Sequence, residues 1–86
     1  MSSRVVTVRV EGRKEMIDME LQSNLPMYKL IYDVEECILA VAPTMIPGNQ
    51  KATVICNRNR SIIQDHQTLE DANVWNGDYI TLKYGE

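Results

Sequence analysis

Residues 68–82, TLEDANVWNGDYITL, decide the fold of this chain. Leu69, Ala72 and Val74 recur at spacings of three and two, which are too short for a full helix. Such spacing is typical of one 3₁₀-like turn that directs small apolar side chains into a core. We therefore expect this stretch to plug the interior immediately before the last strand.

Signals for a cap, a turn and a strand surround this plug. Thr68 and Asp71 have the spacing of a capping box, in which each side chain bonds the backbone N–H of the other residue. Residues 76–78, Asn-Gly-Asp, predict a tight turn, because glycine accepts positive φ and the polar neighbours bond nearby backbone. Residues 79–84 alternate, which predicts a half-buried strand with one face formed by Ile80, Leu82 and Tyr84.

Two further alternating segments, residues 4–10 and 16–21, predict a hairpin that turns at residues 12–15. A register shift of one residue would bury acidic side chains, so the pattern excludes it. The expected register places Val10 opposite Ile17, Val8 opposite Met19, Val6 opposite Leu21 and Arg9 opposite Asp18.

One long helix is expected next. Ser23 or Asn24 would cap it, Pro26 suits its first turn, and Pro43 would end it near residues 41–42. Burying a Leu- or Ile-sized side chain stabilises a fold by roughly 1.5–3 kcal/mol, so we expect this helix to contribute most to the core. Its apolar stripe consists of Met27, Leu30, Ile31, Val34, Ile38 and Val41.

The remaining chain predicts a loop at residues 44–50, a β-branched strand at 51–57 and a short edge strand at 61–64. These elements define an α+β fold, a mixed four- to five-stranded sheet with one long helix packed across it. We expect one domain over residues 1–86, with its ordered core at 4–84.

The composition limits the functional classes. Nine basic residues against twelve acidic ones argue against a nucleic-acid partner. Cys37 and Cys56 lack a CxxC spacing, so both are interpreted as buried, reduced residues. No apolar signal region or membrane-length run is present, which favours a cytoplasmic protein without direct membrane insertion.

The predicted order of elements resembles the ubiquitin-like β-grasp fold, most clearly through Leu69, Val74, Gly77-Asp78 and the strand at 80–82. Residues 21–31, LQSNLPMYKLI, resemble the YukD-like proteins of type VII (WXG-type) secretion systems of Gram-positive bacteria. The ubiquitin-like domain of the multi-span membrane protein of that system has a similar start and ending. This resemblance implies a non-enzymatic protein-binding module that is an accessory or regulatory component of such a system. Its partners would be proteins, including secretion-system membrane components.

Two alternatives remain open. Covalent modifiers and sulfur carriers of this fold need a mobile Gly-Gly tail, which Gly85 and Glu86 do not provide, although removal of Glu86 would expose Gly85 as the last residue. The chain could also be a ubiquitin-like adaptor of another assembly.

Nothing in the sequence predicts catalysis or a cofactor. His66 is the single histidine, and no motif places a nucleophile or carboxylate beside it. The four glycines are scattered rather than gathered in a phosphate-binding loop, and no metal-ligand cluster is recognisable. We therefore expect a protein that is not an enzyme and that holds no cofactor or metal.

The candidate binding residues fall into two groups and one isolated position. A second helical row beside the core stripe contains Tyr28, Tyr32, Glu35, Glu36 and Leu39. This row is either an aromatic-acidic contact strip or a solvated face whose tyrosines flank the core.

The second group lies on the sheet. Either Val54 or Ile55 must face away from the helix; we favour Ile55, with Arg58, Arg60 and Lys83 as a basic rim. Trp75, next to the polar turn, either covers the core or stands out as an anchor. We expect a monomer or a weak homodimer.

Overall fold

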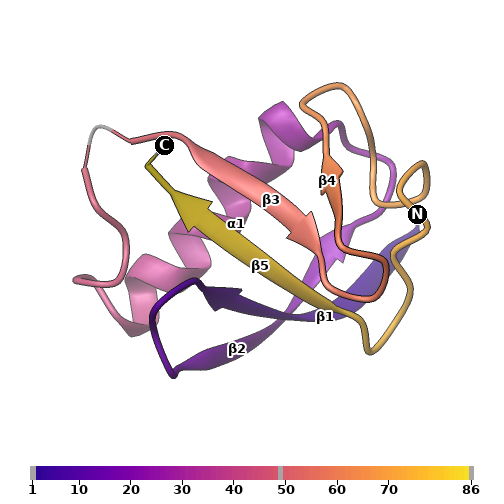
Figure 1. Ribbon diagram of the computed structural model, residues 1–86. Helices are drawn as coiled ribbons and strands as arrows, with labels where there is room; N and C mark the ends of the chain where they lie inside the picture. Colours follow the sequence, from indigo (N-terminus) through magenta and orange to yellow (C-terminus); the bar gives the residue numbers. More distant parts are fainter. Residues whose placement is uncertain (1, 49, 86) are drawn as a thin grey trace.

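The computed structural model describes residues 2–48 and 50–85, which form one sheet and one helix. The helix crosses one face of the sheet and leaves the other face open (Figure 1). In chain order the elements are β1 (Ser3–Val10), β2 (Met16–Gln22), α1 (Met27–Val41), β3 (Ala52–Cys56), β4 (Ser61–Ile63) and β5 (Tyr79–Tyr84). The predicted tail ends at Glu86, and the predicted loop 44–50 includes Asn49; both residues lie outside the described part.

The sheet is mixed and has five strands in the order β2-β1-β5-β3-β4. Only β1 and β5 run parallel; the other neighbours are antiparallel. The last strand therefore occupies the centre beside the first, and the short β4 lies at the edge, as predicted. The predicted α+β fold class is confirmed.

The core lies between α1 and the inner face of the sheet. The helix contributes Met27, Leu30, Val34 and Ile38, all buried. The prediction for Val41 is wrong, because this residue is 68% exposed. Met45 from the following loop is buried and fills this end of the core, so the last helical position is left in solvent.

The predicted hairpin register is wrong by two residues. Val6 lies opposite Met19, Val8 opposite Ile17, and Arg9 opposite Met16 rather than Asp18. A shift of two keeps every side chain on its predicted face, because side-chain direction has a period of two. The expected charge pair is absent, and the carboxylate of Asp18 instead accepts a 2.6 Å hydrogen bond from the hydroxyl of Thr7.

Val10 explains this register. It lies one residue beyond Arg9, the last residue of β1 that pairs with β2. It pairs with Leu82 of β5, and the next residue, Glu11, donates its N–H to the Leu82 carbonyl at 2.9 Å. The chain then turns at once through Gly12, which has φ +86°. The central strand therefore draws the end of β1 away from β2.

The predicted helix cap is also wrong. Pro26 occupies the N-cap position and makes no side-chain cap. The first helical amides, of Met27 and Tyr28, instead donate to the carbonyls of Gln67 and Asp65 at 2.8 and 3.0 Å. Backbone from the loop after β4 thus performs the capping that a polar side chain usually supplies.

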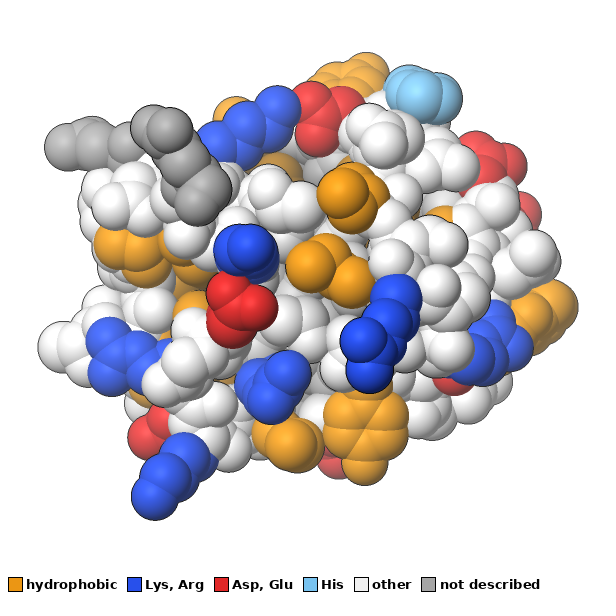
Figure 2. All heavy atoms as spheres, in the orientation of Figure 1, with side chains coloured by type: hydrophobic (Ala, Val, Ile, Leu, Met, Phe, Trp, Pro, Cys, Tyr) orange, Lys and Arg blue, Asp and Glu red, His pale blue; other side chains and the backbone are white. Residues whose placement is uncertain are grey.

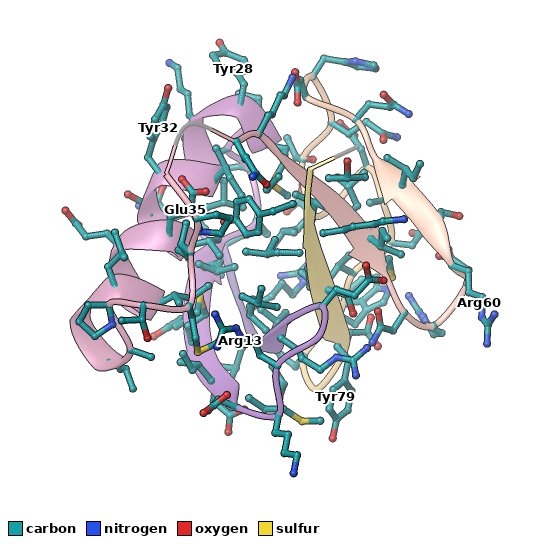
Figure 3. The ribbon with its side chains drawn as sticks, turned by 60° about the vertical axis from the view of Figure 1, so that its left-hand side comes forward. Arg13, Tyr28, Tyr32, Glu35, Arg60 and Tyr79 are labelled. Atoms are coloured by element: carbon teal, nitrogen blue, oxygen red, sulfur yellow. The ribbon has the colours of Figure 1, made fainter. Side chains whose placement is uncertain are left out.

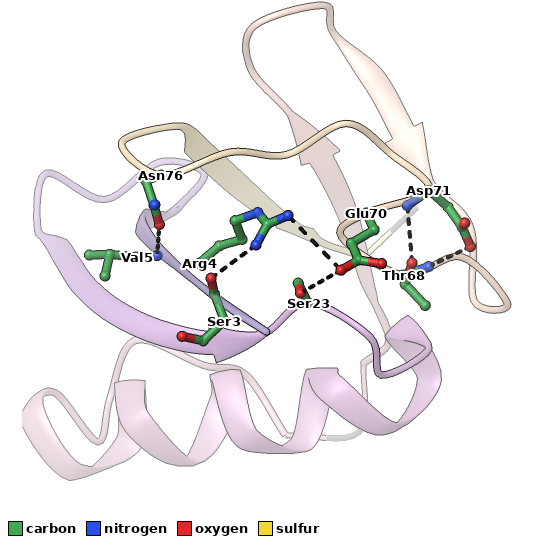
Figure 4. A network of polar contacts seen from close by, with 8 residues as sticks. All are labelled: Ser3, Arg4, Val5, Ser23, Thr68, Glu70, Asp71 and Asn76. Carbon is green, nitrogen blue, oxygen red and sulfur yellow. Dashed lines mark hydrogen bonds and ion pairs between the residues drawn. The ribbon is translucent and has the colours of Figure 1, made fainter. Parts of the chain in front are cut away.

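Ser23, predicted as a possible cap, has a different role. It is fully buried, and its hydroxyl donates to the Glu70 carboxylate at 3.1 Å (Figure 4). Its carbonyl accepts the Glu70 N–H at 3.2 Å. The connection between β2 and α1 is therefore tied to the plug segment instead of to the helix.

The capping box at the plug is confirmed. Thr68 N–H donates to the Asp71 carboxylate at 3.1 Å, and Asp71 N–H donates to the Thr68 hydroxyl at 3.0 Å (Figure 4). Leu69 and Val74 are buried as predicted. The turn is α-like rather than 3₁₀-like, because Ala72 N–H bonds the carbonyl four residues earlier, that of Thr68.

A Schellman motif ends the plug turn. Val74 N–H donates to Leu69 C=O at 2.9 Å, Asn73 N–H donates to Glu70 C=O, and Asn73 has φ +58°. This bond pattern, with a left-handed residue and an apolar contact between the buried Leu69 and Val74, is the usual stop for a helical turn. Both ends of the plug are thus fixed locally.

The predicted Asn-Gly-Asp turn also holds β1. Gly77 has φ +88° and donates its N–H to the Val5 carbonyl at 2.8 Å. Val5 N–H in return donates to the Asn76 side-chain oxygen at 2.8 Å (Figure 4). These two bonds place the start of β5 directly beside β1.

The predicted burial of the cysteines is half right. Cys56 is buried in the sheet, but Cys37 is exposed. Cys37 lies between the core stripe and the outward side of α1, where no strand covers it.

Candidate protein-binding surfaces

The outer face of the sheet, which we call the sheet face, points away from α1. Strand register aligns five side chains across it, one from each strand: Ile62, Ile55, Thr81, Arg9 and Met16. Met16 and Ile62 are 55% and 54% exposed, while Ile55 is half-buried. In Figure 2, which views this side, Lys and Arg side chains surround hydrophobic side chains near the middle.

The middle of the sheet face is hollowed. Thr81 is buried there although it points away from the core, and its hydroxyl donates to the Asn57 side-chain oxygen at 2.7 Å. The hollow has a volume of about 440 Å³ and is lined by Arg9, Glu11, Ile55, Asn57, Arg60 and Thr81. A small polar residue on the central strand thus forms the floor, and larger side chains form the walls.

The charges of this face are mostly unpaired. Within the described residues, Arg9, Arg60 and Lys83 form no ion pair. Arg58, predicted as part of the basic rim, is instead bound: its guanidinium lies 3.3 Å from the Asp78 carboxylate and donates to the Asn73 carbonyl. Arg58 therefore joins the β3–β4 turn to the turn before β5, while Ile55 and Lys83 do lie on the sheet face.

The helix strip, defined as Tyr28, Tyr32, Glu35, Glu36 and Leu39, lies on another side of the molecule. Tyr32 is 72% exposed, and Tyr28 and Leu39 are also exposed. Figure 3 shows Tyr28, Tyr32 and Glu35 along one side of α1, well apart from Tyr79 on the sheet. The predicted helix and sheet candidates are therefore two separate surfaces.

Glu35 is the member of the strip that contacts the sheet. Its carboxylate accepts a 2.6 Å hydrogen bond from the hydroxyl of Tyr84. Burial, this hydrogen bond and the negative charge of Glu35 all raise the pKa of Tyr84 well above its usual range. The pair ties the middle of α1 to the end of β5.

Trp75 is neither a lid nor a free anchor. Its side chain is 53% exposed, and the guanidinium carbon of Arg4 lies 4.6 Å from the centre of its ring. Arg4 is largely buried, donates to the Ser3 carbonyl at 3.1 Å and lies 4.0 Å from the Glu70 carboxylate (Figure 4). Trp75 thus stacks on a fixed cation, and the orientation of its ring is constrained.

The sequence reasoning missed several residues of the sheet face. Ile62 and Tyr79 could have been found. Each is followed by another apolar residue, Ile63 or Ile80, and alternation along a strand directs only one residue of such a pair into the core. Arg9 could not, since its approach to Ile55 depends on the order of strands in the sheet, whereas Arg60, predicted as part of the basic rim, does line the hollow of this face.

The described residues offer no sign of metal chemistry or a membrane span. Across residues 2–48 and 50–85, no three His, Cys, Asp or Glu side chains are placed to hold a metal ion. In the same part of the chain, α1 falls short of the length and apolar character needed to cross a membrane.

Comparisons with known proteins identify the family. A family model described as the YukD protein of the WXG100 protein secretion system matches residues 5–82. No curated protein matches.

Solved structures share the fold. The EccD5 ubiquitin-like domain from Mycobacterium xenopi is 20% identical with a TM-score of 0.77, covering 100% of this chain and 98% of that one. The ubiquitin-like domain of the Mycobacterium tuberculosis type VII secretion system protein ECCD1 is 26% identical with a TM-score of 0.65, covering 96% and 99%. A chain of protomer 1 of the ESX-3 core complex is 19% identical with a TM-score of 0.71, covering 94% of this chain and 18% of that one. This chain has the ubiquitin-like fold and belongs to the YukD family of WXG100 secretion proteins.

Proposed function

We propose that this protein is a cytoplasmic, non-enzymatic docking module that acts as an accessory or regulatory component of a type VII secretion system. The observation that carries the proposal is the match of the YukD family model to residues 5–82. The likeness to the ubiquitin-like domain of ECCD1 supports it. In this proposal residues 1–86 act as one domain, as a monomer or weak homodimer.

The sheet face is the proposed docking surface. Ile55 and Ile62 supply apolar area, and removing such area from water is the main source of affinity at an interface. Within the described residues Arg9, Arg60 and Lys83 form no ion pair, so acidic side chains of a partner would find them available. Recognition would use a preformed surface, with no group transfer.

The proposed partner is a protein of the secretion machinery, including its membrane components. The similarity to one part of a chain of the ESX-3 core complex supports a place beside such a complex.

Site-specific photo-crosslinking in the native host tests this proposal. A photoreactive residue at Ile62, on the sheet face, should capture a component of the secretion machinery. The matched control is Asp33, which is exposed on α1 outside the helix strip and should capture none. Capture only of proteins unrelated to secretion, or equal capture from both positions, would contradict the proposal.

Substitutions separate binding from folding. Ile62→Ser and Lys83→Glu should reduce the captured amount several-fold, because they remove apolar area and reverse a charge at the surface. Exposed positions change stability by about 0.5 kcal/mol or less, so the melting temperature should move by only a few degrees. Unchanged capture by both variants would exclude the sheet face as the docking surface.

A further inference from the structure

The first residues of β3 lie on an open edge of the sheet. β5 pairs with β3 from Ala52 to Cys56, but β4 pairs only with Val54 to Cys56. Ala52 and Thr53 therefore have a neighbouring strand on one side only. We call the backbone of residues 51–53 the β3 edge.

The unpaired backbone groups of this edge belong to Ala52. In an antiparallel pair, the N–H and C=O of one residue point to the same side, and successive residues alternate. Asn57 N–H donates to the Tyr79 carbonyl at 3.1 Å, so Asn57, Ile55 and Thr53 point toward β5. Ala52 must point the opposite way, where no described strand faces its N–H and C=O, because β4 pairs with β3 only from Val54 to Cys56.

β4 does not continue along this edge because its chain turns away. Gln64 N–H donates to the side chain of Gln67 at 2.7 Å, and Gln67 N–H donates to the Gln64 carbonyl at 3.0 Å. A Lys51–Asp65 ion pair of 2.7 Å spans the space beyond the turn. Both side chains are exposed, and exposed pairs contribute at most about 1 kcal/mol, so this contact does not close the edge.

Two hollows flank the β3 edge, one on each face of the sheet. The helix-side hollow, of about 360 Å³, is bounded by Met27, Ile31 and the rings of Tyr28 and Tyr32. The sheet-side hollow, of about 430 Å³, is bounded by Thr53, Ile62 and His66. Ala52 lines both hollows. A strand added at Ala52 would direct successive side chains alternately into the two hollows.

We propose that the β3 edge binds an extended segment of a partner protein as a sixth strand. An apolar side chain opposite Ala52 enters the helix-side hollow, and a Lys or Arg two residues away approaches Glu35. We choose a basic residue for this position of the partner because the carboxylate of Glu35 lines the hollow. Within the described residues no cation pairs with this carboxylate. Backbone pairing would supply affinity, and the hollows would select side chains.

This surface meets the sheet face at Ile62, but its pairing groups belong to the backbone of Ala52, and it would serve a binding partner whatever assembly the protein joins. Its test is therefore direct and uses no secretion component. The probe is the peptide acetyl-VIVK-amide, titrated into the ¹⁵N-labelled full chain and followed by NMR. The peptide isoleucine is designed to pair with Ala52, and the lysine two residues later lies on the Glu35 side, because β4 already occupies the position opposite Val54.

We expect saturable shifts at about millimolar peptide, the range of weak short ligands, centred on Ala52, Tyr28 and Tyr32. The amide of Ala52 should become protected from exchange. Absence of saturable shifts at Ala52, or shifts confined to the other edge strand, β2, would overturn the proposal.

Two controls test the backbone bonds. A peptide N-methylated at its isoleucine keeps every side chain but loses the N–H that would reach Ala52 C=O, so it should bind at least about tenfold more weakly. Ala52→Pro removes the facing N–H at a position where an edge strand tolerates proline, and should weaken binding of the first peptide similarly. Unchanged binding of the methylated peptide would overturn the proposal even if the proline variant failed to fold.

A third control tests the charge. The peptide acetyl-VIVE-amide has the same backbone and apolar residues but places a carboxylate near Glu35. It should bind several-fold more weakly at low salt, and the difference should shrink as salt is added. Equal binding of the two peptides would exclude Glu35 as the selecting group.

Discussion

The hydroxyl of Tyr84 donates to Glu35 across the interface between helix and sheet, and the folded state raises the pKa of this phenol. The raised value means that the folded protein keeps the phenolic proton at pH values where the unfolded chain loses it. Below about pH 10 the titration of this group therefore does not change the free energy of unfolding. Above that pH the free energy of unfolding falls as the pH rises. One tyrosine thus makes the fold sensitive to alkali.

Tyr84→Phe should change stability in two ways. At neutral pH the variant should lose about 1 kcal/mol, because the Glu35 carboxylate loses a hydrogen-bond donor. Above about pH 10 the loss of stability with pH should be shallower than in the wild type. Urea unfolding at several pH values measures both effects.

Tyr32→Phe is the matched control, because the Tyr32 ring stands 72% exposed on the same helix. It should leave the free energy of unfolding within about 0.5 kcal/mol of the wild type. If the free energy of unfolding fell equally with pH in the wild type and in Tyr84→Phe, the Tyr84–Glu35 contact would not be the cause of the lost stability at alkaline pH.

Individual residues also show what the sequence could not reveal. The sequence predicts Arg58 as part of a basic rim and leaves Trp75 open between a lid and an anchor, but each is held by a partner distant in the chain, Asp78 and Arg4 respectively. Nothing in the local pattern indicates these pairs, because they form only when the turns around β5 come together. Thr68 and Asp71 were predicted correctly because their contact is local.

At the scale of elements, α1 depends on a loop for its start. Its first two amides bond carbonyls of residues 65–67, and the next two, of Lys29 and Leu30, bond the Pro26 carbonyl. The bond of Leu30 is the first regular helical one, and the three amides before it, which a helix usually leaves without acceptors, are therefore all satisfied. The Gln64–Gln67 turn and the helix should consequently open together.

Hydrogen exchange measures this coupling. We expect the amides of Met27 and Tyr28 to be protected nearly as well as the helix interior, whereas first-turn amides normally exchange quickly. Gln67→Ala removes the side chain that accepts the Gln64 N–H, so it should speed exchange at both amides about tenfold, for a loss of about 1.4 kcal/mol in the local opening energy.

Gln22→Ala, at an exposed position of β2, is the matched control and should leave these two amides unchanged. Fast exchange at Met27 and Tyr28 in the wild type would contradict the proposed role of the loop.

The elements themselves were largely predictable from the sequence. The bounds of β5 agree with the prediction, and the helix begins and ends close to where its prolines indicate. The hairpin register was not predictable, because alternation specifies which face a residue takes but not which of two registers, two residues apart, is formed. The choice between them comes from Val10, whose partner Leu82 lies 72 residues away.

At the scale of the whole molecule, the two cysteines report on different levels of opening. Cys37 is exposed on α1, while Cys56 is fully buried in β3 between β4 and β5. A thiol reagent can reach Cys56 only when the sheet separates, which requires most of the core to open.

Thiol labelling should therefore be biphasic. One thiol should react at the rate of a free cysteine, and the second should react slowly, at a rate that rises with urea as global unfolding becomes more frequent. Cys37→Ser should remove the fast phase and leave the slow one. Fast labelling of both thiols in native buffer would show that the β3–β4 edge opens independently of the core.

The candidate sites also differ in how far the sequence could predict them, because some depend on residues close together in the chain and others on the assembled sheet. The helix strip was predictable because helical spacing alone places Tyr28 and Tyr32 together. The sheet face was predicted only in part, since its row of side chains draws one residue from every strand. The β3 edge was not predictable at all, because it exists where β4 is shorter than its neighbour.

The central position of β5 has a consequence for synthesis. On the ribosome, β1, β2 and α1 emerge first, yet β1 and β3 cannot be joined until the last strand has left the exit tunnel. Until that moment the nascent chain has one side of β1 and one side of β3 exposed, and such unpaired edges are prone to wrong pairing. A chain stalled on the ribosome shortly after residue 84 should therefore remain unfolded until a C-terminal extension is long enough to carry β5 out of the tunnel.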